Sequence, residues 1–431
     1  MTLLGVELQF IHIFRVTIFI PDNDKTPVYD ELHFLEANIV RNIITHLNIK
    51  YQYIMLEAVD SVVLYDRFWM CWKLVGIATD QNKYICGLYD LCLNIFVTIF
   101  YPLHLTIGLF MEPTLGDVFK NLAINVTCIV CSLKHLLFRY KLKKIRAVQS
   151  ILHELDRRVV AAEERKYFSE VPKASALLVV NAFFTAYIFS NITAIAATLL
   201  ASEPRLMYPA WLPFDWSSNT FTYWAALLYQ FVGITIQIIQ NLANDIYAPM
   251  SLCIFAGHVH MLGMRLSKLG HNPILKQDDV NKQLLQCIED HKLLLKIFYL
   301  LQDTLSLAQL AQFISSGLNI CIVLVYLLFF ADNIFSYIYY SVYFVSMTIE
   351  IFPCCYYGSI LQEEFANLPY AVFKSNWLES QRNYRRHMII FTVLAQKQVT
   401  PLAGGIIAIH LNAFFTTCKM AYSLFAVLRQ N

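Results

Sequence analysis

The chain has 431 residues, of which 57% are hydrophobic and 15% are charged, with a mean hydropathy of +0.49. A soluble domain averages about 25% charged residues, so 33 basic and 31 acidic residues are too few to cover the surfaces of a soluble chain of this length. The composition excludes an ordinary cytosolic or secreted enzyme and indicates a membrane protein. The formal net charge of +2 also provides no basic field for nucleic acid.

Stretches without Asp, Glu, Lys or Arg predict seven membrane-spanning helices, because a helix needs about 20 apolar residues to cross a bilayer. Five stretches are long enough by themselves: 91–111, 174–202, 216–244, 304–331 and 398–418. Two shorter ones, 121–133 and 333–349, complete the set. Lys120 and Lys134 flank the first of these, and we expect their ammonium groups to reach the membrane surfaces. The expected fold is all-α and polytopic.

The uncharged stretch 246–264 is a further candidate span, but it contains Pro249, His258 and His260. We interpret it as a continuation of the fourth helix on the cytoplasmic side. An eighth span here would place the six basic residues of 265–303 on the opposite side of the membrane from the other basic clusters.

Basic residues are distributed very unevenly between the two sides of the predicted spans. Of the 33 Lys and Arg residues, 28 fall in the segments 1–90, 134–173, 265–303 and 363–387, which lie on one side. Basic residues accumulate on the cytoplasmic side, so we expect a cytoplasmic N-terminus and an extracellular C-terminus. This orientation is inverted relative to G-protein-coupled receptors, and the function is not expected to require a G protein.

Motifs of catalysis, metal binding or cofactor binding are absent from the sequence, which contains no HExxH, P-loop, GxGxxG or GxSxG pattern. Cys128 and Cys131 lie within the second span, where packing explains them. His258 and His260 are two residues apart on a helix, so they point in different directions. We therefore predict no catalytic residue, metal or cofactor. Transport has no support either, because the acidic candidates Asp245 and Glu350 lie toward the inner ends of spans.

The segment 351–431 resembles the C-terminal signature of insect odorant receptors. The matching motifs are Cys355-Tyr356-Tyr357-Gly358; Leu368, Ala371, Phe373, Ser375 and Trp377; Ala395-Gln396-Lys397; Pro401; Ala403-Gly404-Gly405; Lys419-x-Ala421-Tyr422-Ser423; and Val427-Leu428-Arg429. Upstream, Tyr65-Asp66-Arg67-Phe68-Trp69 is similar to the start of the family before its first span. The segment 265–303 lacks the long insertion of the family's shared co-receptor, so the chain looks like a ligand-tuned subunit.

The resemblance implies an odorant-gated, non-selective cation channel in the plasma membrane of sensory neuron dendrites, assembled as a heterotetramer with the co-receptor. It divides the chain into a cytoplasmic N-terminal segment (1–86), helices one to six with cytoplasmic extensions at 246–303 (87–362), a cytoplasmic anchor (363–404) and a pore-lining last helix (405–431). Two alternatives remain open at this stage: a gustatory-type homotetrameric channel for a polar tastant, and a membrane transporter.

A small, apolar, volatile ligand calls for an apolar and aromatic pocket between the outer halves of the helices. The predicted pocket residues are Asn125, Tyr187, Asn191, Tyr223, Leu227, Tyr326, Tyr339 and Tyr343. By the family resemblance, the predicted pore and gate residues are Tyr422, Phe425, Leu428 and Arg429. These recur at helical spacing, so one narrow face of the last helix is expected to form an apolar constriction.

Overall fold

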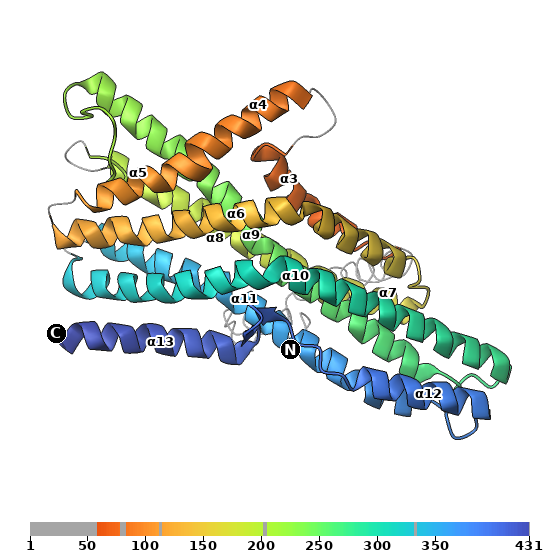
Figure 1. Ribbon diagram of the computed structural model, residues 1–431. Helices are drawn as coiled ribbons and strands as arrows, with labels where there is room; N and C mark the ends of the chain where they lie inside the picture. The colour runs from red at the N-terminus through yellow and green to blue at the C-terminus, as the bar shows by residue number, and fades with distance from the viewer. Residues whose placement is uncertain (1–57, 78–82, 112–113, 201–204, 332–333, 431) are drawn as a thin grey trace, which may run out of the picture. The chain divides into compact units, whose positions relative to one another are not determined.

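A computed structural model describes residues 58–77, 83–111, 114–200, 205–331 and 334–430, which form an almost wholly helical structure (Figure 1). The first expected segment, 1–86, lies mostly outside the described residues. In chain order the elements are η1 (Val62–Tyr65), α3 (Asp66–Leu74), α4 (Lys83–Leu93), η2 (Asn94–Ile99), α5 (Phe100–Leu109), α6 (Leu115–Asp156), α7 (Ala162–Phe168), η3 (Ser169–Lys173), α8 (Ala174–Leu199), α9 (Thr220–Lys268), α10 (Gln277–Phe329), α11 (Ile334–Phe373), α12 (Arg382–Ala395), β1 (Leu402–Ala403), β2 (Ile407–Ala408) and α13 (Leu411–Gln430).

Six helical stretches among the described residues are long and apolar enough to cross a membrane. They are Tyr84–Leu109, Leu115–Asp156, Ala162–Ala196, Thr220–Lys268, Gln277–Phe329 and Tyr337–Phe373. The prediction of an all-helical protein with several membrane spans is therefore confirmed. The seventh predicted span, 398–418, was placed too early: its first part forms the hairpin of β1 and β2, and the last helix begins at Leu411, later than both this span and the expected pore helix 405–431. This helix, α13, has 20 residues and so a length of about 30 Å, the thickness of a bilayer's hydrocarbon core.

Several helices continue far beyond the length that a membrane needs. α9 runs unbroken for 49 residues through Pro249, so the stretch 246–264 is part of the fourth long helix. α10 runs for 53 residues, which gives a length of about 80 Å. α11 likewise continues past Glu350 and ends at Phe373, before α12 begins at Arg382. The segment 363–387 is therefore two helical pieces joined by a turn.

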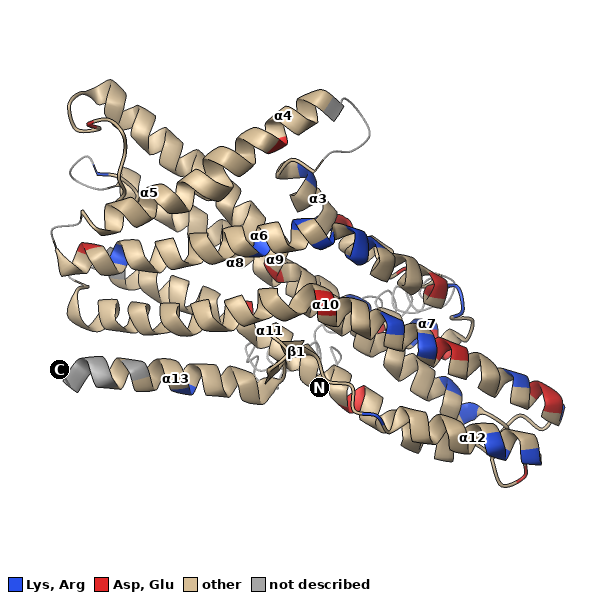
Figure 2. Cartoon of the chain, viewed as in Figure 1, with Lys and Arg blue, Asp and Glu red and all other residues tan. Residues whose placement is uncertain are grey.

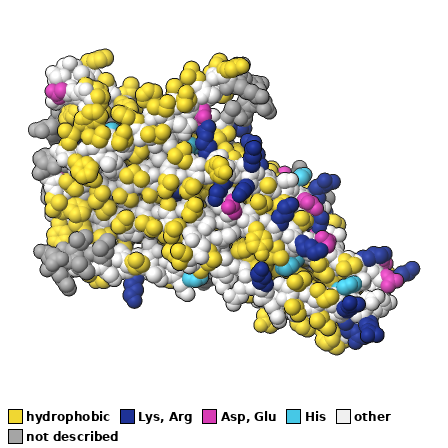
Figure 3. Space-filling view, in the orientation of Figure 1, with side chains coloured by type: hydrophobic (Ala, Val, Ile, Leu, Met, Phe, Trp, Pro, Cys, Tyr) yellow, Lys and Arg dark blue, Asp and Glu magenta, His cyan; other side chains and the backbone are white. Residues whose placement is uncertain are grey.

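Charged residues collect at one end of the helices, where α7, α12 and the ends of α6, α9 and α10 lie (Figure 2). On the face seen in Figure 3, the rest of the surface is dominated by apolar side chains. On α8, for example, Leu178, Ile188, Phe189 and Ile192 are all more than half exposed. Exposed aliphatic side chains on a helix of this length are typical of lipid contact, so the two surfaces separate a membrane region from a water-exposed region.

The centre of the core is α9, whose residues from Gln240 to Val259 are all buried. α6, α8, α10, α11 and α3 all pack around α9. Ser61, at the start of the described chain, is fixed to this core by three hydrogen bonds. Its amide donates to Asp156 Oδ2 (2.8 Å), and its hydroxyl lies 2.8 Å from Asp156 Oδ1 and 2.9 Å from His258 Nε2. These three side chains are buried, so the trio joins α9 to the end of α6 within the core.

The chain enters α13 through a short antiparallel hairpin, in which β1 pairs with β2. Gly404 and Gly405 form its turn with φ of +61° and +72°, a region that side-chain-bearing residues rarely adopt. Behind the hairpin, Gly358 of α11 packs against the backbone carbonyl of Ile409, and a Cβ at this position would overlap the Ile409 oxygen. Both glycine sites of the C-terminal signature therefore serve the entry into the last helix.

We expect Gly358→Ala to lower the free energy of unfolding by about 1–3 kcal/mol, because the added methyl group meets backbone that cannot rotate away. Gly87→Ala on α4 is the matched control, since the space around Gly87 is open. Replacing this helical glycine by alanine is expected to raise the free energy of unfolding slightly. Thermal unfolding in detergent micelles measures both effects. Equal melting temperatures for the two variants would contradict the close contact at Gly358.

Candidate ligand-binding site

A cavity of about 600 Å³ lies between α6, α8, α9 and α11, with the loop 205–219 contributing to its wall. Along α6 its lining extends from Asp117 to Cys131, 14 residues or about 21 Å. The cavity is therefore elongated, and it has the size of a site for a small organic molecule. Its wall carries polar groups at both ends.

Four tyrosines make up an aromatic part of the wall: Tyr326 of α10 and Tyr339, Tyr340 and Tyr343 of α11. The rings of Tyr326 and Tyr340 lie 4.1 Å apart between centroids, and those of Tyr339 and Tyr343 are stacked 6.4 Å apart. The Tyr343 hydroxyl is 2.6 Å from Thr127 Oγ1 and so ties α11 to α6. Since these rings are held by neighbours, the aromatic surface is formed before any ligand binds.

The loop 205–219 is held over the cavity by buried amide side chains. Gln230 of α9 donates to the Tyr208 carbonyl (3.0 Å) and accepts from the Met207 amide (3.0 Å). Asn121 of α6 donates to the Pro209 carbonyl (3.0 Å). Burial raises the pKa of the Tyr208 phenol well above its usual range, so this cavity-lining side chain stays neutral. The loop thus forms a fixed part of the cavity wall.

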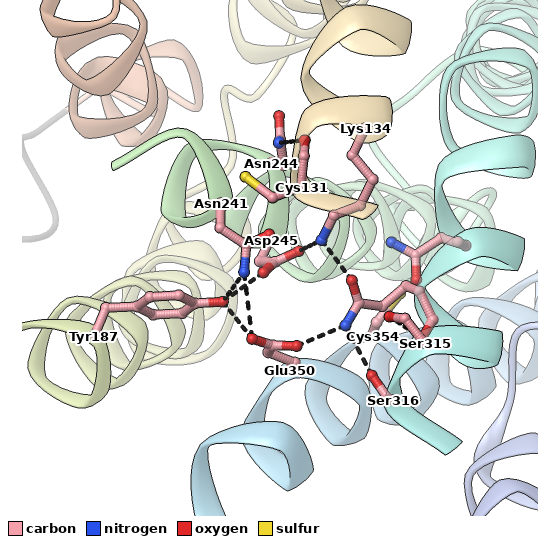
Figure 4. A network of polar contacts seen from close by, with 12 residues as sticks. Cys131, Lys134, Tyr187, Asn241, Asn244, Asp245, Ser315, Ser316, Glu350 and Cys354 are labelled. Carbon is pink, nitrogen blue, oxygen red and sulfur yellow. Dashed lines mark hydrogen bonds and ion pairs between the residues drawn. The ribbon is translucent and has the colours of Figure 1, made fainter. Parts of the chain in front are cut away.

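A buried set of six polar side chains closes the end of the cavity near Cys131 (Figure 4). We call it the polar network; its members are Lys134, Tyr187, Asn241, Asp245, Gln312 and Glu350, from five different helices. Glu350 Oε1 lies 2.6 Å from the Tyr187 oxygen, and its Oε2 accepts from Gln312 Nε2 at 2.6 Å. Tyr187 also lies 2.5 Å from Asp245 Oδ2.

The expectation that the Lys134 ammonium group reaches the membrane surface is wrong. The Lys134 side chain is only 2% exposed, and its ammonium group pairs with Asp245 and donates to Gln312 in place of reaching the membrane surface. Lys120, by contrast, is part-exposed, 3.0 Å from Asp117. The reason for the difference is Asp245: a carboxylate on the neighbouring helix stabilises a buried cation that would otherwise have to extend to water.

Five of the eight predicted pocket residues line the cavity: Tyr187, Asn191, Tyr326, Tyr339 and Tyr343. The other three do not. Asn125 is buried behind the wall and accepts a hydrogen bond from Thr106 (3.1 Å). Tyr223 contacts the Arg205 carbonyl at the surface (3.4 Å), and Leu227 lines a separate apolar cavity of about 250 Å³ between α8 and α9.

The predicted pore residues divide between two environments. Tyr422 is 64% exposed, whereas Phe425 is buried against Cys321 and Val325 of α10. The side chains of Leu428 and Arg429 lie outside the described residues. Within this chain, therefore, Tyr422 and Phe425 do not share one open face of α13.

Sequence reasoning missed the loop residues Met207 and Tyr208 and the cavity-lining Glu350. A usable signal existed only for Glu350, because an acid within a predicted span is expected to have a partner or a function. Among the described residues no group of three or more His, Cys, Asp or Glu side chains is placed to hold a metal ion. The arrangement is suited to binding a small molecule by shape and a few polar contacts.

Comparison with known proteins places this chain in one family. A family model described as "7tm Odorant receptor" matches residues 114–422. The chain is 45% identical to Odorant receptor 33b of Drosophila melanogaster over 371 residues, covering 86% of this chain and 97% of that protein. It is 42% identical to Odorant receptor 33a of the same species, with the same coverage of both chains.

The fold is also similar to that of the insect olfactory receptor OR5 from Machilis hrabei. The TM-score is 0.75 at 16% sequence identity, covering 86% of this chain and 99% of that one. A second structure of that receptor, in complex with eugenol, matches equally well. The chain is thus a multi-pass membrane protein and not an enzyme, and it belongs to the insect odorant receptor family, among its ligand-tuned members and apart from the shared co-receptor.

Proposed function

We propose that this chain is the odorant-binding subunit of a ligand-gated, non-selective cation channel, working as a heterotetramer with the family's co-receptor. The observation that carries the proposal is the aromatic-walled cavity of about 600 Å³ between helices of a membrane protein in this family. Such a cavity suits a small volatile molecule, which can contribute apolar surface and few polar groups.

A direct packing route joins this cavity to α13. Met347 lines the cavity on one side and packs with Ile320 and Ala421 on the other. A ligand that fills the cavity only in the open arrangement would shift the position of α11 and, through Met347, that of α13. The differential affinity for the two arrangements then sets how far the equilibrium moves toward the open channel.

In this proposal the pore is lined by the face of α13 that the chain leaves uncovered. Asn412, Thr416, Lys419 and Ser423 are all exposed and recur every three or four residues. Tyr422 is exposed beside this polar stripe, whereas Phe425 packs inside the subunit. A lysine on a lipid-facing surface would be costly, so a water-filled pore shared with partner subunits fits this face better.

The charged end of the helices is assigned to the cytoplasm, because basic residues accumulate on that side. α12, the end of α11 and the extensions of α9 and α10 gather there and are proposed to anchor the tetramer (Figure 2). The receptor would then lie in the plasma membrane of sensory neuron dendrites with its cavity toward the outer leaflet. It would need neither a G protein nor a cofactor.

Electrical recording tests the proposal most directly. The chain is expressed in cells with and without the co-receptor, and current is measured under a panel of volatile compounds. We expect odorant-evoked cation current only with both subunits. Robust current from the chain alone would contradict the heteromeric assembly, and no current with both subunits over a broad panel would contradict the channel function.

We expect Tyr339→Ala and Tyr343→Ala each to raise the half-maximal odorant concentration about tenfold, which corresponds to ~1.4 kcal/mol of lost binding free energy. Both rings lie on the cavity wall. Tyr337→Ala is the matched control, because Tyr337 is exposed and does not line the cavity. Dose–response recordings measure the shift. Unchanged potency in both cavity variants would remove these rings from the binding site.

A further inference from the structure

The end of the cavity formed by the polar network contains one cation and two carboxyl groups. Lys134 of α6 pairs with Asp245 of α9, and within the described part of the chain Glu350 of α11 forms no ion pair of its own. The polar groups in hydrogen-bond contact with Glu350 are neutral: Tyr187 of α8, Gln312 of α10 and Asn241 of α9. Two ionised carboxylates beside a single ammonium group would leave one buried negative charge uncompensated.

The hydrogen bonds show where the balancing proton lies. A phenol has one proton to donate, yet the Tyr187 oxygen is 2.5 Å from Asp245 Oδ2 and 2.6 Å from Glu350 Oε1. Both contacts are hydrogen bonds only if one carboxyl group also carries a proton. Asp245 is already paired with Lys134, so the proton belongs on Glu350, which donates to the Tyr187 oxygen while Tyr187 donates to Asp245.

Two further acceptors belong to the same part of the wall. The amide nitrogen of Gln237 donates to the Val97 carbonyl (2.9 Å), and that of Asn241 donates to the Tyr187 oxygen (2.7 Å). Turning the Gln237 amide over would place its oxygen against the Val97 carbonyl oxygen. The Asn241 orientation follows from the proton arrangement above, because a Tyr187 hydroxyl that donates to Asp245 can only accept from Asn241. The oxygens of both amides are buried and have no hydrogen-bond partner within the described part of the chain. Such groups are costly to leave unpaired.

We propose that this end of the cavity binds a volatile amine, with Glu350 as its anchor; the inference rests on the proposed function and specifies its ligand class. The amine enters as the neutral free base and takes the proton of Glu350, so that an ammonium group forms beside a carboxylate. The network is electrically neutral before and after this transfer, since the new cation balances the new anion. No charged species has to cross the apolar wall.

An ammonium group suits the acceptors better than other small polar groups. It can donate to the Glu350 carboxylate and to the amide oxygens of Gln237 and Asn241, whereas an alcohol has a single proton to donate. The charged pair at the far end of the elongated cavity, Asp117 with Lys120, is about 21 Å away along α6 and is already satisfied internally. The tyrosine wall between the two ends takes the apolar part of the ligand.

Three compounds with the same number of heavy atoms separate the amine contribution from shape: 2-phenylethylamine, 2-phenylethanol and propylbenzene. Binding is measured as the thermal shift of the full-length chain in detergent, and gating as current with the co-receptor. We expect 2-phenylethylamine to act at concentrations about tenfold below the other two. Glu350→Gln should abolish that advantage, so that 2-phenylethylamine acts at about the same concentration as propylbenzene and 2-phenylethanol. Glu364 is on the same helix but contacts His260 outside the cavity, so Glu364→Gln should retain the advantage of 2-phenylethylamine.

The two readouts keep this inference distinct from the channel function. Equal thermal shifts for the three compounds on the unmodified chain would overturn the amine site, even if Glu350→Gln cannot be produced. Currents evoked equally by all three would also overturn it while the channel function stands. An amine-selective thermal shift without current under any compound would support the site and contradict the proposed function.

Discussion

Substitution of Lys134 by methionine is expected to lower the free energy of unfolding by about 3–5 kcal/mol, among the largest effects of any single change in this chain. The Lys134 side chain is 2% exposed and pairs with Asp245, which is 4% exposed. Methionine fills a similar volume, so the loss comes mainly from the uncompensated buried carboxylate. Thermal unfolding in detergent gives the change in stability.

Two further variants assign this effect to charge. Lys144 is on the same helix, but its ion pair with Asp303 is exposed. Lys144→Met should therefore lower the free energy of unfolding by no more than about 1 kcal/mol. The double variant Lys134→Met with Asp245→Asn leaves no unpaired charge and should recover more than half of the loss. Additive losses in the double variant would show that packing, and not the ion pair, explains the role of Lys134.

The sequence predicted the helical framework well because both of its signals are local. Uncharged stretches mark the spans, and the distribution of Lys and Arg places the charged end, which Figure 2 shows at one end of the helices. The continuation of the fourth helix through 246–264 was also predicted, from the residues of this stretch and from the basic residues that follow it. The break inside the expected anchor, 363–404, was not predicted: α11 ends at Phe373 and α12 begins only at Arg382, and no local signal in the periodicity marks this turn.

The site was predictable only in part, because its key contacts join residues far apart in the chain. Tyr339 and Tyr343, predicted from their helical spacing, both line the cavity, and their contact with a ligand stays a prediction. Lys134, Asp245 and Glu350 were each visible as charges near span ends, but no local pattern shows that they meet. Tyr187 illustrates the same limit: aromatic character placed it in the pocket, and only the fold shows that it bridges two carboxyl groups.

A second ion network, at the charged end of the helices, supports the last prediction. Asp290 of α10 is 2% exposed and accepts hydrogen bonds from Arg158 and from Arg265 Nη1 (2.6 Å). Arg265 of α9 in turn donates to Glu164 of α7 (2.9 Å). One buried carboxylate thus joins α9, α10 and the segment after α6. We expect Asp290→Ala to lower the free energy of unfolding by about 3–5 kcal/mol, because the guanidinium groups of Arg158 and Arg265 lose their shared partner.

Glu289→Ala is the matched control for Asp290→Ala, since it removes a neighbouring carboxylate of the same helix. Glu289 is exposed and, among the residues that the structure describes, pairs with Lys292, so its loss should lower the free energy of unfolding by about 0–1 kcal/mol. Similar melting temperatures for the two variants would contradict the role of Asp290.

The two ion networks should also differ in their effect on odorant responses. Asp290 lies 22 residues before Gln312 on α10, which places it about 33 Å from the polar network. Asp290→Ala should therefore reduce the amount of channel at the cell surface and so the maximal current, without shifting the half-maximal odorant concentration. Lys134→Met should change both the maximal current and the half-maximal odorant concentration, because the polar network forms the end of the cavity. A shifted odorant concentration with Asp290→Ala would mean that the charged end takes part in ligand recognition as well as in folding.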